Sequence, residues 1–359
     1  MTGGSGADSI TIGGSQRTVT VSGVETLTGS ESADAVTFSA AVTSMRLDLQ
    51  GGADALVLAD AANRVSAYNI ESITGGTATD TVYLGGSAGQ SVTLTGVDSV
   101  TGTAGADQAS FGGATTVTVG SLESLVGSTA AERVALNESG TVTATAIDSI
   151  IGTDGRDQVN MGSGAATTNA TSIDVLIGTA EVQHVTLGAA QTAGIVNLLG
   201  GADRLSLADG GNSLSAFNVE SILGGAGADQ VTANDLGCGC DDGLVVANIE
   251  TLLNALDDIG TVAFSGAATT TVSGFDILVG SSAPERITLG FGTGVLAANI
   301  DTIVGDPDDP SDLALATPGT VTVSGITFLL GSPGTDLVTV SGASTMVVAE
   351  IDTLVGSTA

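Results

Sequence analysis

Acidic residues at the ends of glycine-rich turns are the part of this sequence best suited to chemistry. In the two fullest examples, residues 3–10 and 224–231, glycines lead into Asp8 and Asp229. The chain carries 39 acidic and seven basic residues, a formal net charge of −32. Self-repulsion of this size destabilises a folded chain unless cations screen or bridge the carboxylates. The binding of divalent cations is therefore the first chemistry that the pattern indicates.

These turns resemble the calcium-binding nonapeptide of RTX proteins (hemolysin-type repeats), Gly-Gly-x-Gly-x-Asp-x-aliphatic-x. The two segments above match it fully, and other turns match in part. In that family, glycine carbonyls and aspartate carboxylates of successive coils ligate Ca²⁺, which takes six to eight oxygens. The resemblance implies Ca²⁺ as a cofactor. The metal ligands that it implies are Asp8, Asp54, Asp80, Asp107, Asp157, Asp203, Asp229 and Asp336.

Several turns depart from the calcium motif. The glycines are lost in residues 30–34, 128–132 and 281–285, and Gln183 stands where an acid is expected. Isolated calcium sites between well-matched neighbours are then expected, rather than a continuous ladder. The alternative is that Asp and Gly serve here as ordinary residues of tight turns.

The turns belong to a repeat that occurs 14 times, mostly at spacings of 22 to 27 residues. A unit of this size cannot bury its own apolar face and must stack on its neighbours. Residues 99–123 contain three short hydrophobic–polar alternations separated by turns, which is typical of short strands. We expect an all-β fold, a β-solenoid (parallel β-helix) of about 14 coils of 22–30 residues. The sequence leaves its handedness open.

A longer repeat lies above the short one. Residues 49–54 parallel residues 198–203 at an offset of 149. The sequence predicts one continuous solenoid over residues 1–359. Its parts are duplicated six-coil cassettes at 26–174 and 175–327, with partial cassettes at 1–25 and 328–359.

The composition excludes several classes of partner. All seven basic residues are arginines, too few for the basic patches that bind nucleic acid. An anionic membrane surface would repel the chain, and no run of 18 apolar residues predicts insertion into a bilayer. The first residues lack the basic and apolar regions of a signal peptide.

Residues for nucleophilic catalysis are scarce. His184 is the single histidine and has no partner motif, so we expect no enzyme activity. A β-helix enzyme acting on polysaccharide through a carboxylate pair is the alternative. Threonine runs such as residues 116–118 suggest an ice-binding or adhesin module as another. Cys238 and Cys240 lie in a glycine-rich insertion and form either a surface loop, with or without a disulfide, or a metal or cross-linking site.

Neither end of the sequence has the polar cap that usually closes a solenoid. We therefore expect an extracellular structural protein whose coils stack head-to-tail on a second copy into filaments or a surface layer, stabilised by calcium. Cell-surface polysaccharide is a second partner to consider, and signal-peptide-independent (type I-like) secretion is the expected route of export. The alternative for the open ends is that the chain is a fragment of a longer repeat protein.

Overall fold

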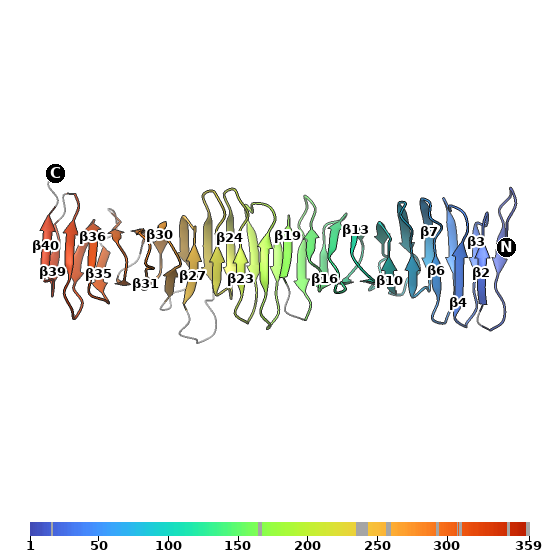
Figure 1. The fold of residues 1–359 in the computed structure, drawn as a ribbon, viewed down its shortest axis with the longest axis horizontal. Helices are drawn as coiled ribbons and strands as arrows, with labels where there is room; N and C mark the ends of the chain where they lie inside the picture. Colours follow the sequence, from blue (N-terminus) through green and yellow to red (C-terminus); the bar gives the residue numbers. More distant parts are fainter. Residues whose placement is uncertain are drawn as a thin grey trace. The chain divides into compact units, whose positions relative to one another are not determined.

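Alternating apolar and polar residues form short parallel β-strands throughout the computed structural model (Figure 1). The structure describes residues 1–15, 17–163, 167–234, 243–255, 260–291, 294–306, 308, 311–342 and 345–356. Contacts divide the chain into two units, residues 1–173 and 174–359.

The first unit alternates between two sheets, one of odd-numbered and one of even-numbered strands. Its strands are β1 (Ser9–Thr11), β2 (Arg17–Val21), β3 (Thr26–Thr28), β4 (Asp34–Phe38), β5 (Met45–Asp48), β6 (Ala55–Val57), β7 (Asn63–Tyr68), β8 (Ser72–Thr74), β9 (Asp80–Leu84), β10 (Ser91–Thr95), β11 (Ser99–Thr101), β12 (Gln108–Phe111), β13 (Thr115–Gly120), β14 (Ser124–Val126), β15 (Glu132–Leu136), β16 (Thr141–Thr145), β17 (Ser149–Ile151), β18 (Gln158–Met161) and β19 (Thr167–Thr171).

The second unit follows the same rule. Its strands are β20 (Val175–Ile177), β21 (His184–Leu187), β22 (Gly194–Asn197), β23 (Arg204–Ser206), β24 (Ser213–Phe217), β25 (Ser221–Leu223), β26 (Gln230–Asn234), β27 (Leu244–Ala247), β28 (Thr251–Asn254), β29 (Thr261–Phe264), β30 (Ala268–Ser273), β31 (Ile277–Val279), β32 (Glu285–Leu289), β33 (Val295–Ala298), β34 (Thr302–Val304), β35 (Ser311–Leu315), β36 (Thr320–Ser324), β37 (Ile326–Leu330), β38 (Leu337–Val340), β39 (Val347–Ala349) and β40 (Thr353–Gly356).

Each coil of the solenoid contains two strands, one in each sheet. Strand β10 pairs in parallel with β12, so that Ser91 lies opposite Gln108, 17 residues later. The fold is the predicted parallel β-solenoid, but it has about 19 turns of about 17 residues rather than about 14 coils of 22–30 residues.

The coil size differs from the prediction because the sequence repeat and the structural coil contain different numbers of strands. The repeat at residues 99–123 contains three strands, β11, β12 and β13, as its pattern indicates. Since a coil takes two strands, one repeat makes one and a half coils. The first strand of one repeat, β11, therefore lies in the odd-numbered sheet, and that of the next, β14, lies in the even-numbered sheet.

Inward-facing side chains form stacked columns that build the core. One column in the first unit runs through Val65, Val82, Val100 and Val119, which are paired strand to strand. All four are fully buried. β-Branched residues suit this position because they pack well on a pleated surface, and each buried valine contributes roughly 1.5–3 kcal/mol. Within the described residues there is no helix of the length and apolarity needed to cross a membrane.

Candidate functional sites at the coil corners

A glycine that ends the first strand of most repeats allows a close approach of two coils. At Gly102, a β-carbon would lie 1.9 Å from the carbonyl oxygen of Ser121 in the next coil. Ser121 has φ 48°, and this left-handed conformation ends the third strand of the repeat. Gly127 makes the same contact with Ala146, also at 1.9 Å. Glycine is needed at these corners for the space between coils.

The acid after the glycine is buried and accepts hydrogen bonds from the backbone. Oδ2 of Asp107 accepts the Thr103 N–H at 2.6 Å and the Thr103 hydroxyl at 2.9 Å. Its Oδ1 accepts the N–H of Gln90, in the preceding coil, at 2.7 Å. One carboxylate thus closes its own turn and joins it to the coil before it, satisfying donors that would be costly to leave unpaired.

Most of the predicted metal ligands occupy this same position. Asp8 is half-buried and the other seven are buried. A hydrogen bond from the N–H four residues earlier is made to Asp8, Asp34, Asp80, Asp107, Glu132, Asp157, Asp229, Glu285 and Asp336. The amide side chain of Gln183 accepts the equivalent bond, so this role does not require a charge.

A second acid, four positions before the corner glycine of the next repeat, has a related role. The N–H of Asp107 donates to Oε2 of Glu123 at 2.7 Å, and the N–H of Asp80 donates to Oδ2 of Asp98 at 2.7 Å. Both acceptors are exposed side chains. These acids bond to the backbone of the coil before them, a role that sequence reasoning did not assign.

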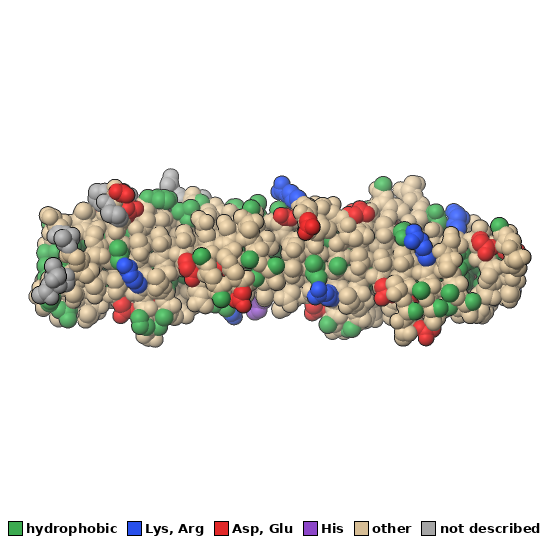
Figure 2. Space-filling view, turned by 90° about the horizontal axis from the view of Figure 1, so that it is seen from above, with side chains coloured by type: hydrophobic (Ala, Val, Ile, Leu, Met, Phe, Trp, Pro, Cys, Tyr) green, Lys and Arg blue, Asp and Glu red, His purple; other side chains and the backbone are tan. Residues whose placement is uncertain are grey.

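The structure does not bring the predicted calcium ligands together. Each three-strand repeat begins in the other sheet from the repeat before it. The acids of successive three-strand repeats therefore lie at opposite edges of the solenoid. Asp107 and Asp157 precede β12 and β18 in the same sheet, three coils apart, which is about 14 Å at the usual strand spacing. Among the described residues no group of three or more His, Cys, Asp or Glu side chains could hold a metal ion. On the face drawn in Figure 2, the exposed acids are scattered rather than aligned in a row.

The hydrogen bonds of Asp107 compete with the coordination of Ca²⁺. The ion takes six to eight oxygens, whereas the oxygens of Asp107 already face three N–H or O–H donors. The geometry favours the alternative interpretation of the motif, in which Asp and Gly serve to build tight turns. Calcium binding itself stays an untested prediction.

Asp54 is one of four described corner acids with a buried oxygen that has no hydrogen-bond partner. Its repeat contains two strands, one whole coil, so it lies beside the acid of the previous repeat, and the N–H of Asp34 donates to its Oδ1 at 2.7 Å. The expected donor, Gln50, has φ 73° and its N–H donates instead to Asp48. Oδ2 of Asp54 is buried without a hydrogen-bond partner. Burial, with some repulsion from the carboxylates of Glu71 and Asp34, raises the pKa of Asp54 to about 6.

The second unit repeats this arrangement at Asp203. Leu199 has φ 67° and its N–H donates to Asn197, so Oδ2 of Asp203 is left buried without a partner. Burial is again the main cause that raises the pKa of Asp203, to about 6. Here the neighbour in the preceding coil is the neutral Gln183, whose N–H donates to Oδ1 of Asp203 at 2.6 Å.

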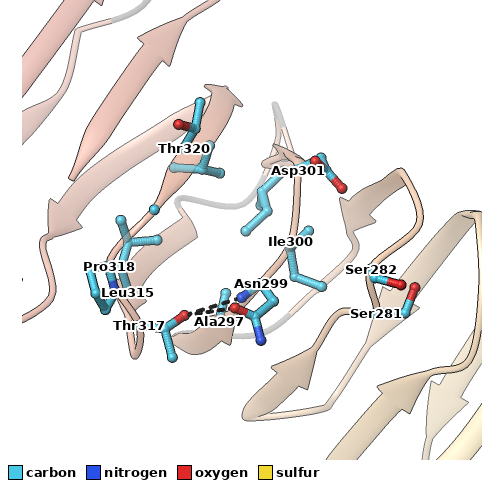
Figure 3. A pocket seen from close by; sticks show the side chains of 13 residues that line it. Ser281, Ser282, Ala297, Asn299, Ile300, Asp301, Leu315, Thr317, Pro318 and Thr320 are labelled. Carbon is cyan, nitrogen blue, oxygen red and sulfur yellow. Dashed lines mark hydrogen bonds between the residues drawn. The ribbon is translucent and has the colours of Figure 1, made fainter. Parts of the chain in front are cut away.

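Small polar hollows line the corners. The one in Figure 3 has a volume of about 210 Å³ and lies between three coils of the second unit. The N–H of Asn299 donates to the Thr317 hydroxyl at 3.3 Å on one side, and Asp301 lies apart from them. A similar hollow of about 190 Å³ lies beside Glu123 in the first unit. Their recurrence identifies them as products of the repeat.

Other residues singled out in the sequence remain apart. His184 is exposed on β21, and Cys238 and Cys240 lie outside the described residues. Sequence reasoning missed two cation–π pairs on the outer face of the first unit. The Arg46 guanidinium lies 4.2 Å from the centre of the Tyr68 ring, and that of Arg64 lies 4.6 Å from the Tyr83 ring. These four residues lie at outward positions of β5, β7 and β9, and that placement could have predicted the pairs from the sequence.

No protein-family model, curated protein or solved structure matches the chain.

Proposed function

We propose that the chain is a non-enzymatic structural solenoid of an extracellular surface or matrix, whose coils stack head-to-tail on a second copy. The observation that carries the proposal is the parallel, in-register pairing of consecutive coils, which leaves β39 and β40 able to pair with a further coil. Val348 continues the column of buried Leu329, and Leu354 continues that of buried Val338. Yet Val348 is 39% exposed and Leu354 is 47% exposed.

A further coil in the same register would cover these side chains and pair with the outer edges of both strands. In the first unit, Ile10 and Val19 lie in the inward columns of Leu27 and Val36 and are only half-buried. Joining these two different surfaces makes a heterologous contact, which gives open filaments when it does not close into a ring.

The roles of the recurring acids also support a structural function. The corner carboxylates bond to the backbone of their own and neighbouring coils, as Asp107 does. Extracellular placement with type I-like secretion is part of the proposal and rests on the acidic composition and on the resemblance to RTX repeats. Cell-surface polysaccharide stays a predicted second partner.

Leu354→Lys tests the stacking, with Val355→Lys as its matched control. Both residues lie on β40 and both are exposed, but Leu354 continues an inward column and Val355 lies on the outer face, in register with Thr339. A lysine in the inward column would bury an unpaired charge under the next coil. In light scattering and electron microscopy of the full chain, we expect assemblies for the wild type and Val355→Lys, and monomers for Leu354→Lys. A wild type that stays monomeric at high concentration contradicts the proposal, as does equal loss in both variants.

A further inference from the structure

One outward-facing ladder differs in character between the two units although its register is the same. In the first unit it runs through Ser124, Thr143 and Asn160. The equivalent ladder of the second unit, on β31, β33 and β35, runs through Ile277, Leu296 and Ala314. At these outward positions the first unit has polar side chains and the second unit has apolar ones. Core packing does not require apolar side chains there.

This apolar ladder contains a hollow of about 470 Å³. The small side chain of Ala314 lies between larger neighbours, because Leu296 precedes it and Leu330 follows it in the ladder. Leu296 is 38% exposed. An exposed apolar surface that is concave and continuous over several strands is typical of an interaction site.

A β-bulge adds an aromatic side chain to the hollow. The pairing of β35 with β37 shifts register between Ser311 and Asp312, so that Thr327 has no opposite residue. Thr327 and Phe328 consequently both face outward, and Phe328 lines the hollow. Bulges commonly redirect a side chain next to functional sites.

Two carboxylates also line the hollow, Asp276 and Asp312. Among the described residues, the Gly260 N–H donates to the carboxylate of Asp276 and the Thr327 hydroxyl donates to that of Asp312. In the described part of the chain, the salt bridge that forms is between Arg46 and Asp48, so these two acids have no cationic partner there. The hollow therefore combines an apolar floor with uncompensated negative charge.

We propose that this hollow binds an extended basic, amphipathic segment of a partner protein, with apolar side chains over Ala314 and Lys or Arg beside Asp276 and Asp312. Charge complementarity selects this occupant, since Asp276 and Asp312 line the hollow and have no cationic partner among the described residues. Phe328 offers the partner's cation a ring face. The site adds a binding function to the structural role proposed above and does not depend on stacking.

The test uses the full chain and a fluorescein-labelled short peptide that carries two leucines flanked by lysines among serines. Ala314→Leu fills the hollow, and Asn160→Leu places the same residue at the matched register of the first unit. In fluorescence anisotropy at physiological ionic strength, we expect Ala314→Leu to weaken binding about tenfold and Asn160→Leu to leave it unchanged. Asp312→Asn should weaken binding and reduce its dependence on salt, because one screened charge contact is lost. Urea unfolding of each variant verifies its fold.

Two matched peptides separate the hollow from general attraction to an acidic protein. We expect a peptide with serines in place of the leucines to bind weakly and equally to wild type and Ala314→Leu, and one with glutamates in place of the lysines not to bind. If the leucine–lysine peptide does not bind, or binds Ala314→Leu as tightly as wild type, the proposal is wrong. If light scattering shows a wild-type dimer that Ala314→Leu dissociates, the occupant is a second copy and the proposal is equally wrong.

Discussion

Two corners, one in each unit, have the same geometry and different surroundings. In the first unit, the Ser128 N–H donates to Oε1 of Glu132 at 3.0 Å, and the N–H of Glu132 donates to Asp148 at 3.0 Å. The second unit has the same pair of bonds around Glu285, at 2.8 Å and 3.1 Å. In both, the remaining glutamate oxygen is buried without a hydrogen-bond partner.

The surroundings of these corners have diverged. The left-handed residue over the glycine is Ala146 in the first unit and Asn299 in the second, with φ 53° and 56°. On the outer face beside them, Thr143 corresponds to Leu296. The corner is held constant because it joins consecutive coils, whereas an outward side chain can change without disturbing the stack. Functional differences are therefore expected on the outer faces.

The largest effect is expected from filling the space at the corner glycines. In Gly127→Ala and Gly280→Ala, the added β-carbon would lie 1.9 Å and 2.0 Å from a carbonyl oxygen of the next coil. Because backbone must move in both, we expect each to lower the free energy of unfolding by about 3 kcal/mol in urea titrations followed by circular dichroism. Gly140→Ala is the control, since nothing lies within 4 Å of its β-carbon. If only one of the two variants lost stability, the two corners would not be equivalent.

A pH-dependent effect is expected at Asp54. Its pKa is raised from 3.8 to about 6, so the folded state binds more protons than the unfolded state between these values. Stability from this group is therefore present below pH 4 and lost as the pH rises through about 6. We expect Asp54→Asn to be more stable than wild type at pH 7, by about 2 kcal/mol, with the difference shrinking toward pH 4.

The control for Asp54→Asn is Asp60→Asn. Hydrogen bonds from the Thr77 N–H and hydroxyl lower the pKa of Asp60, so this change should reduce stability at pH 7 rather than raise it. Asp203→Asn should behave as Asp54→Asn does, since the buried oxygen is common to both. A pH-independent difference for Asp54→Asn would show that the buried charge is not its cause.

A smaller effect is expected at the left-handed residues, where the two corners differ. Alanine is unfavourable at the positive φ of Ala146, whereas asparagine tolerates this region. Ala146→Gly should raise the free energy of unfolding by about 1 kcal/mol, as measured by urea titration. Asn299→Gly should raise it by less, because this change removes the hydrogen bond that the Thr317 hydroxyl donates to Oδ1 of Asn299. Equal gains in both variants would contradict this account of the difference.

The smallest effect is expected on the outer face. Arg64 stacks on Tyr83 in the first unit, while the equivalent position 149 residues later is Ser213. We expect Arg64→Ala to cost about 0.5 kcal/mol, typical of an exposed cation–π pair. Ser213→Ala, measured by the same thermal unfolding, should be close to neutral. A loss above that of the glycine variants would mean that the outer face supports the stack.

Local features of the fold were predictable from the sequence. The three strands of the repeat at residues 99–123 follow from hydrophobic alternation between turns, and the turns follow from Gly102 and Asp107. The calcium ligands were inferred from the same turns, yet that pattern does not reveal whether Oδ1 of Asp107 meets a metal or the N–H of Gln90 in another coil. The unpaired oxygen of Asp54 could not be predicted from the sequence either, because it depends on the left-handed conformation of Gln50.

The sequence by itself determined an acidic all-β solenoid with glycine–acid corners, because strand and turn preferences act over a few residues. The tertiary structure alone decided that a coil closes after two strands while the repeat contains three. That choice sends the acids of successive three-strand repeats to opposite edges, whereas the two-strand repeat of Asp54 places it beside Asp34. It also aligns Ile277, Leu296 and Ala314 into one apolar ladder. Coil closure depends on contacts between residues 15 to 24 positions apart, and no local preference encodes which strands meet.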